Sequence, residues 1–303
     1  MARNRFAPDR GLTSRMVLTM FLLGLVYVVF VAVLVVVLRD AWPLALVIAG
    51  GLLFVQYFFS DRIALFSMHA REVTPEQAPQ LHAIVDRLCA LADMPKPRVA
   101  IADTDMPNAF ATGRNSRRAV VCATSGILRR LEPEELESVL AHELSHVAHR
   151  DVAVMTVASF LGVLAGLLTQ VGLRIGMFGG FSRDRDSNTG AVLLLVTLVS
   201  TVVYAISFLL IRALSRYREL SADRSAALLT GKPSTLAAAL TKISGQMARI
   251  PTRDLRQAEP FNAFFFTPAV SGGQGLATLF STHPPLPQRL DQLGRISREL
   301  GRY

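Results

Sequence analysis

Cysteine is scarce in this sequence. Only Cys89 and Cys122 occur among 303 residues, and they form neither a close pair nor a CxxC motif. This spacing excludes a disulfide framework and a thiolate metal site. We therefore expect two ordinary reduced thiols in a reducing compartment.

Charged side chains are also few. They make up 18% of the residues, whereas 51% are hydrophobic, a balance typical of membrane proteins rather than soluble domains. The net charge is +9, yet no zinc-finger, RNP or basic-region pattern occurs, so we expect no nucleic-acid partner. We interpret the excess of arginine as basic residues beside membrane spans, where they set orientation and contact anionic lipid of the bilayer.

Four apolar runs contain no acidic or basic residue, which argues against a transporter. They cover residues 16–38, 41–59, 152–173 and 191–211. Each is close to the roughly 20 residues of a membrane-spanning helix. A signal peptide is the alternative for the first run, but its apolar region would be shorter and would end at a small-residue cleavage site. For the last two runs, the alternative is a buried helix pair that only dips into the bilayer.

The positions of arginine predict the orientation of these helices. Several precede the first run and only one follows it: Arg3, Arg5, Arg10 and Arg15 before, Arg39 after. Because basic residues stay on the cytoplasmic side, the N-terminus is expected there, and each pair of spans returns the chain to the same side. Three arginines in the loop after the third run weaken this assignment: Arg174, Arg183 and Arg185.

The polar stretches predict a small α+β domain. Helices are expected at residues 74–93 and 133–149, and short strands at residues 98–101 and 119–122. The second helix is favoured by Pro133 and by three glutamates in its first turns. Residues 251–282 are rich in Pro, Gly, Phe and Thr, which predicts a long ordered loop.

A metal-binding motif lies within the helix expected at residues 133–149. It has the sequence His142-Glu143-Leu144-Ser145-His146. Residues four apart share one face of a helix, so both imidazoles can reach one metal ion. Glu143 lies one step round the helix, beside the metal, where it can act as general base for an attacking water. A buried, hydrogen-bonded ring is the alternative for each histidine, but this spacing on a helix favours a metal site.

A catalytic zinc site needs a third protein ligand. His149 is seven residues beyond His142, about 10 Å along a straight helix, and is therefore too far away. Glu219 is the better candidate, because it follows the fourth apolar run and two spans return the chain to the side of His146. Asp223, four residues later on the same face, can accept the N–H of a ligating histidine. The alternative is a solvated ion-pair face with the neighbouring arginines, Arg216, Arg218 and Arg224.

Three further motifs accompany the HExxH sequence. They are PNAFATG at residues 107–113, RELSAD at residues 218–223 and STHPPLPQRL at residues 281–290. With LAHELSH at residues 140–146, in this order, the chain resembles the HtpX-type integral-membrane metallopeptidases. These belong to the gluzincin group and are relatives of the CAAX prenyl proteases. The resemblance extends over nearly the whole length.

The resemblance implies roles for residues outside the metal motif. It implies an edge strand that holds the substrate backbone, formed by Asn108, Ala109 and Phe110. It also implies that His283 lies near the open metal position and donates to the oxyanion, and that Arg289 braces the site against Asp223. From residue chemistry alone, His283 before two prolines equally suits a surface turn. The family further implies turnover of misfolded membrane proteins under stress.

The sequence thus predicts a mainly α membrane protein with four hydrophobic helices. It also predicts an α+β, zincin-like metallopeptidase domain with a small β-sheet and an HExxH helix. We expect hydrophobic hairpins at residues 1–60 and 152–211, and the two parts of the catalytic domain at residues 61–151 and 212–303. One Zn²⁺ per chain is expected, because two histidines and a carboxylate in a hydrolase suit zinc best.

The expected activity is hydrolysis of peptide bonds in proteins, membrane proteins above all. The expected location is a multi-pass position in a bacterial-type inner membrane, with the active site facing the cytoplasm. A CAAX-type endopeptidase is one alternative, although such enzymes usually have more spans. A non-catalytic membrane chaperone or scaffold is another, although it would more often carry a broken HExxH motif.

Overall fold

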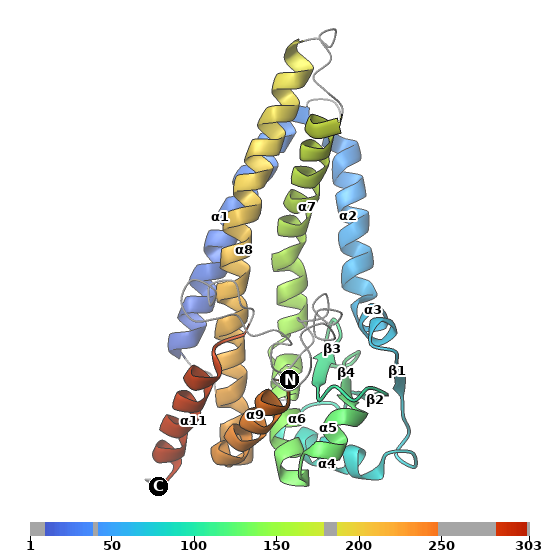
Figure 1. Cartoon of the computed structure of the whole chain (residues 1–303), viewed down its shortest axis with the longest axis vertical. Coiled ribbons are helices and arrows are strands. Elements are labelled where there is room, and N and C mark those ends of the chain that lie inside the picture. The colour runs from blue at the N-terminus through green and yellow to red at the C-terminus, as the bar shows by residue number, and fades with distance from the viewer. Residues whose placement is uncertain (1–9, 39–41, 179–186, 248–282, 302–303) are drawn as a thin grey trace.

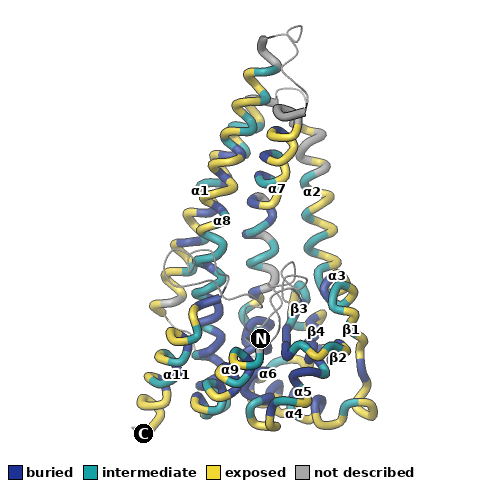
Figure 2. The backbone as a smooth tube through the Cα atoms, viewed as in Figure 1, coloured by how far each residue is buried: buried dark blue, intermediate teal, exposed yellow. Residues whose placement is uncertain are grey.

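The molecule is elongated, with long helices at one end and a small mixed sheet among shorter helices at the other (Figure 1). This computed structural model describes residues 10–38, 42–178, 187–247 and 283–301. Figure 2 shows that exposed residues run along the long helices, whereas buried residues concentrate at the end that carries the sheet. The long helices therefore present much apolar surface outward, with a smaller buried cluster between three of them, and the larger core lies at the end that carries the sheet.

The long helices coincide with the four apolar runs. They are α1 (Arg10–Leu38), α2 (Trp42–Phe58), α7 (Asp151–Phe178) and α8 (Ser187–Thr230). In the described chain, three segments are long and apolar enough to cross a membrane: Thr13–Val36, Val154–Arg174 and Gly190–Thr230. The remaining helix, α2, has 17 residues and rises about 26 Å, slightly less than the ~30 Å of a bilayer's hydrocarbon core.

Small residues on α7 allow it to pack closely against its neighbours. A Cβ atom added at Gly172 would lie 2.0 Å from Oγ1 of Thr197 on α8, and one at Gly166 would lie 3.1 Å from the ring of Tyr204. The hydroxyl of Tyr27 on α1 donates to the backbone oxygen of Ala158 on α7 over 2.6 Å. In the low-dielectric interior of a bundle, such close contact and hydrogen bonding are what hold helices together.

The sheet has four short strands in the order β1-β2-β4-β3. Their bounds are Ala70–Glu72 (β1), Arg98–Ala102 (β2), Ala109–Thr112 (β3) and Val120–Thr124 (β4). β2 and β4 pair in parallel, while β1 and β3 each pair antiparallel to their neighbour. β3 is therefore an edge strand of this sheet, paired with β4 on one side.

Shorter helices enclose the rest of this end. They are α3 (Ser60–Ser67), α4 (Pro79–Ala92), α5 (Ser125–Arg130), α6 (Pro133–Ala148), α9 (Pro233–Met247) and α11 (Leu286–Leu300). α6 is central, since it contacts β3 and β4 on one side and α4, α8 and α9 on others. One hydrophobic core joins residues of all these neighbours, for example Val85, Leu140, Ala226 and Leu240.

Two predicted elements differ from the structure or lie outside it. The helix predicted at residues 74–93 begins only at Pro79, and residues 75–78 form a turn. Proline disfavours the helical conformation in the residue before it, and Ala78 accordingly has φ −143°. The loop predicted at residues 251–282 lies outside the described residues. The strands and the HExxH helix agree with prediction within two residues.

Candidate metal centre

The start of α6 is fixed by local interactions. Pro133 occupies the first turn, and a capping box joins Glu132 and Glu135: each side chain accepts a hydrogen bond from the other's backbone N–H. From Leu136 to Val147 every residue of the helix is buried. The sequence therefore places a rigid, enclosed helix where the two histidines lie.

The two histidines of α6 point at each other and at a carboxylate from α8. The Nε2 atoms of His142 and His146 are 3.2 Å apart. Oε2 of Glu219 lies 3.5 Å from Nε2 of His142, and Oε1 lies 3.4 Å from Nε2 of His146. The three side chains are buried, and one ligand atom from each fits within 4.8 Å of the others. α8 is a single helix of 44 residues, so the apolar run at residues 191–211 and Glu219 lie on the same continuous helix.

Each histidine is held from behind by a carboxylate. Nδ1 of His142 lies 2.9 Å from Oδ1 of Asp223. Arg289 donates two hydrogen bonds to the same carboxylate, one of 2.7 Å to Oδ2 and one of 2.6 Å to Oδ1. With Nδ1–H donating to the aspartate, the Nε2 atom of His142 keeps its lone pair for a metal. Asp223 and Arg289 are both buried, so this ion pair is not a surface contact and can fix the orientation of the His142 ring.

A second carboxylate, not expected from the sequence, holds the other ring. Nδ1 of His146 lies 2.6 Å from Oδ2 of Asp151, and the same oxygen lies 3.1 Å from Nε of Arg218. Asp151 is the first residue of α7, and the chain reaches it through a left-handed residue, Arg150, with φ 57°. The sequence does show that Asp151 directly precedes an apolar run. It does not show the turn at Arg150 that brings Asp151 close to His146.

The donor set fits a divalent cation. If Nδ1–H of each ring donates to its aspartate, both Nε2 atoms keep lone pairs that face each other and Glu219. Three lone-pair donors that face one point repel one another unless a proton or a metal cation lies between them. Two imidazoles and one carboxylate are a combination typical of zinc. His142, His146 and Glu219 could therefore hold a metal ion.

The protein around the rings favours positive charge. Burial alone would lower the pKa of His146, but its hydrogen bonds to Asp151 and Glu219 outweigh burial and raise the pKa to about 10. His142 is shifted in the same direction, because Asp223 and Glu219 outweigh burial. Burial likewise opposes ionisation of Asp151, yet Arg218 and His146 hold its pKa below the ordinary value. The negative potential that protonates the isolated rings is also the one that attracts a metal cation.

Glu143 lies between the metal group and the edge strand. Its Oε2 atom accepts a hydrogen bond of 3.1 Å from the backbone N–H of Ala111 in β3. Burial raises the pKa of Glu143 and outweighs the opposing effect of the two histidines. A carboxylate with a raised pKa, near a metal site, has the proton affinity that a general base needs.

The remaining predicted residues lie around this centre. Nδ1 of His283 is 3.2 Å from Oε2 of Glu219, so this histidine is at the site and buried rather than in a surface turn. Ala109 and Phe110 begin β3, Asn108 directly precedes it, and all three are buried. His149 is the C-cap residue of α6 and is not among the residues that could bind the metal. Arg218 pairs with Asp151 rather than forming a solvated face with Glu219.

Comparisons with known proteins identify the family of this chain. A sequence model described as Peptidase family M48 matches residues 75–297. Protease HtpX homolog 1 of Streptomyces coelicolor is 64% identical over 299 residues, which are 99% of this chain and 97% of that protein. A Protease HtpX homolog of Moorella thermoacetica is 54% identical over 304 residues, covering 98% of each chain.

A solved structure shares the fold. The chain superimposes on the crystal structure of S. mikatae Ste24p with a TM-score of 0.54 at 17% sequence identity. The match covers 89% of this chain and 62% of that one, so the chain spans less than two thirds of Ste24p. The family match and the near full-length relatives show that the chain belongs to peptidase family M48, as a membrane-associated zinc metalloprotease of the HtpX type.

Proposed function

We propose that this metalloprotease is an endopeptidase whose zinc ion is held by His142, His146 and Glu219 and whose general base is Glu143. One observation carries the proposal: three ligand atoms from α6 and α8 lie within 4.8 Å of one another, with Glu143 beside them and bonded to an edge strand. When bound there, zinc supplies Lewis acidity, which polarises a peptide carbonyl and acidifies a water molecule.

The side chains then divide the work of peptide hydrolysis. Glu143 accepts a proton from the attacking water and passes it to the leaving amine, so no covalent intermediate with the protein is needed. His283, close to Glu219, donates to the oxyanion that develops on the scissile carbonyl. Asp223 and Asp151 keep the ligating imidazoles in the tautomer that leaves Nε2 free.

The edge strand supplies a binding surface for an extended substrate. Thr124 donates from its backbone to the oxygen of Asn108, and the register pairs Phe110 with Cys122. In an antiparallel pair the hydrogen-bonded positions alternate, so Ala109 and Ala111 direct their backbone groups away from β4. The bond from Ala111 to Glu143 has this outward direction. A substrate strand added to β3 would therefore pass directly over the general base.

The membrane arrangement is part of the same proposal. Hairpins at residues 1–60 and 152–211 cross the bilayer, so that four spans, α2 included, anchor a catalytic unit formed by residues 61–151 and 212–303. The basic N-terminal segment supports a cytoplasmic active site in a multi-pass inner-membrane protein. Substrates are membrane proteins, misfolded ones in particular, because an edge strand recognises backbone rather than sequence and lies near the membrane-facing helices.

The test uses full-length protein purified in neutral detergent. We expect about one zinc per chain, cleavage of unfolded casein at internal bonds, loss of cleavage with a chelator, and recovery when zinc is restored. Peptide mapping by mass spectrometry distinguishes internal cleavage from removal of terminal residues. A protein that binds unfolded casein but never cuts it, with zinc present, would contradict the proposal and indicate a non-catalytic scaffold.

A further inference from the structure

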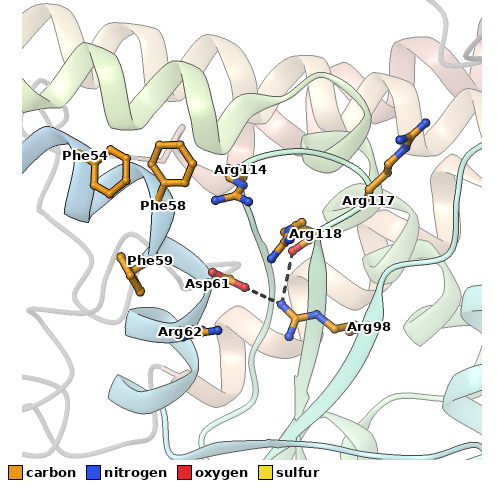
Figure 3. Close-up of a pocket in the computed structure, with 9 residues that line it drawn as sticks. All are labelled: Phe54, Phe58, Phe59, Asp61, Arg62, Arg98, Arg114, Arg117 and Arg118. Atoms are coloured by element: carbon orange, nitrogen blue, oxygen red, sulfur yellow. Dashed lines mark hydrogen bonds and ion pairs between the residues drawn. The ribbon is translucent and has the colours of Figure 1, made fainter.

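A cavity of about 540 Å³ lies away from the metal group, where the end of α2 and the start of α3 meet the loop between β3 and β4 (Figure 3). Its volume lies within the range of small-ligand pockets. Figure 3 shows aromatic rings on one side, with Arg62 beside Phe59, and most of the arginines on the other side: Arg98, Arg114, Arg117 and Arg118. Neither wall contributes to the proposed peptide hydrolysis.

The basic wall is built by a shaped loop. Gly113 has φ +127°, and a Cβ atom there would lie 2.6 Å from the backbone oxygen of Arg118, so the loop needs glycine at this position. Asn115 then closes a turn by accepting the backbone N–H of Arg118 on both its backbone and side-chain oxygens, each at 3.0 Å. Three arginines of this loop line the cavity: Arg114, Arg117 and Arg118.

Among the described residues, little negative charge offsets the positive charge of the cavity. The lining contains five arginines and one carboxylate, that of Asp61. Arg98 neutralises this carboxylate over 2.6 Å and also reaches the backbone oxygen of Arg118 over 3.5 Å, which ties α3 to the loop. Four guanidinium groups of the lining form no ion pair with any described residue: Arg62, Arg114, Arg117 and Arg118. Such a concentration of one sign attracts an anion.

The aromatic wall belongs to the membrane-facing helix. Phe54 and Phe58 stack with ring centroids 4.3 Å apart near the end of α2, and they are 54% and 40% exposed. The guanidinium of Arg114 lies 4.5 Å from the ring of Phe58, so the basic and apolar walls touch. Arg62 lies 5.7 Å from the ring of Phe59 in the same way. Apolar and cationic groups thus meet where an apolar helix ends.

We propose that this cavity binds the headgroup of an anionic phospholipid. The phosphate lies among Arg114, Arg117 and Arg118, which donate charge-assisted hydrogen bonds. The glycerol and first acyl carbons lie against Phe54 and Phe58. The proposal rests on membrane association and on charge complementarity, not on the catalytic chemistry.

A lipid fits these observations better than an acidic peptide substrate does. A peptide along β3 contacts backbone groups, whereas three of the nine residues that line this cavity are exposed phenylalanines at the end of an apolar helix. A phospholipid matches both walls at once, because its phosphate and its acyl chains are joined in one molecule. Anionic headgroups are also what basic residues beside spans commonly contact.

The test measures lipid binding to the full-length protein in neutral detergent by native mass spectrometry. Phosphatidylglycerol and phosphatidylcholine with matched acyl chains are titrated against wild type and the double variant Arg114→Gln/Arg117→Gln. We expect the variant to bind phosphatidylglycerol about tenfold or more weakly, with weak phosphatidylcholine binding unchanged. Arg295→Gln/Arg298→Gln, on exposed positions of α11, removes the same charge and should leave both lipids unaffected.

Further arms identify the source of the anion. Phe58→Ala should also weaken phosphatidylglycerol binding, and millimolar inorganic phosphate should not displace the lipid. Displacement by phosphate alone would overturn the proposal in favour of a simple anion site. If the pocket double variant and the α11 double variant lose phosphatidylglycerol affinity equally, the effect is one of net charge and the proposed site is refuted. A raised KM of the pocket double for an acidic peptide, with unchanged lipid binding, would overturn it in favour of substrate recognition.

Discussion

Oδ2 of Asp151 lies 2.6 Å from Nδ1 of His146, and both residues are buried. The first residue of a membrane-facing helix thus orients a histidine on the HExxH helix. It forms the counterpart of Asp223, which holds His142 from the other side. Each aspartate also forms an ion pair with an arginine: Asp151 with Arg218, and Asp223 with Arg289. Each of the two histidines is therefore oriented by an aspartate whose charge an arginine balances.

This relationship predicts a role for Asp151 in metal binding. In Asp151→Asn the ring of His146 loses its ionised partner, and we expect zinc affinity to fall by about 10–100-fold. Competition with a fluorescent chelator measures the affinity without reference to catalysis. Asp86→Asn, on an exposed position of α4, is the matched control and should bind zinc as wild type does. Equal affinities of the two variants would contradict the positioning role.

Glu143→Gln should separate metal binding from catalysis. The amide preserves the size of the side chain and can still accept the hydrogen bond from Ala111, but it cannot take a proton. We expect casein cleavage to fall by about 10²–10⁴-fold, while zinc content stays at the wild-type level. A variant that keeps zinc and retains most of its activity would refute the general-base assignment.

The packing of α7 against α8 predicts a size limit at Gly172. An added Cβ atom would lie 2.0 Å from Oγ1 of Thr197, so Gly172→Ala should destabilise the folded protein by roughly 1–3 kcal/mol. Thermal unfolding in detergent measures the loss. Thr197→Ala in the same chain removes the clashing atom and should restore part of the stability. Gly24→Ala, with no atom within 4 Å, is the control; if it is as destabilising as Gly172→Ala, the packing explanation fails.

The capping box of α6 predicts a pH-dependent contribution to stability. Burial alone raises the pKa of Glu135, but Lys242 at 2.8 Å and the backbone N–H of Glu132 lower it overall. A lowered folded-state pKa means that the stabilisation is present above the unfolded pKa of about 4.3 and is lost as pH falls through the folded value. Glu135→Gln should therefore be less stable than wild type near neutral pH, by roughly 0.5–1 kcal/mol.

The difference between Glu135→Gln and wild type should disappear in acid, since both chains then carry a neutral side chain at this position. Unfolding temperatures at a series of pH values test this directly. Glu134→Gln changes the same turn without the cap, and its ion-pairing carboxylate is mostly exposed, so its effect should be smaller. A stability difference for Glu135→Gln that persists unchanged below pH 4 would show that charge is not its cause.

Local patterns in the sequence were sufficient for the parts of the fold that depend on nearby residues. The spacing of His142 and His146 requires only a helix, and Glu219 follows from the return of the chain after two apolar runs. Asp151 could not be found in this way, because its contact depends on the left-handed turn at Arg150. The partner of Arg218 could not be predicted either, because the same residues in a sequence can form an exposed ion pair or a buried one.

Tertiary packing also decided features that have no local signal in the sequence. β1 contains only three residues and is held by pairing with β2, so no strand pattern marks it. The cavity beside Phe58 requires α2, α3 and the β3–β4 loop to meet, although Gly113 and the arginines after it are visible as a basic turn. Side chains that act together across distant segments are the part of a site that periodicity cannot supply.

The zinc content of Glu219→Ala is the most direct measure of the central claim, that α6 and α8 together hold the metal. Inductively coupled plasma mass spectrometry of the purified full-length chain, after dialysis against zinc-free buffer, gives the stoichiometry. We expect about one zinc per chain in wild type and in Glu143→Gln, and almost none in Glu219→Ala. Full occupancy in Glu219→Ala would show that the third ligand lies elsewhere and would contradict the proposed centre.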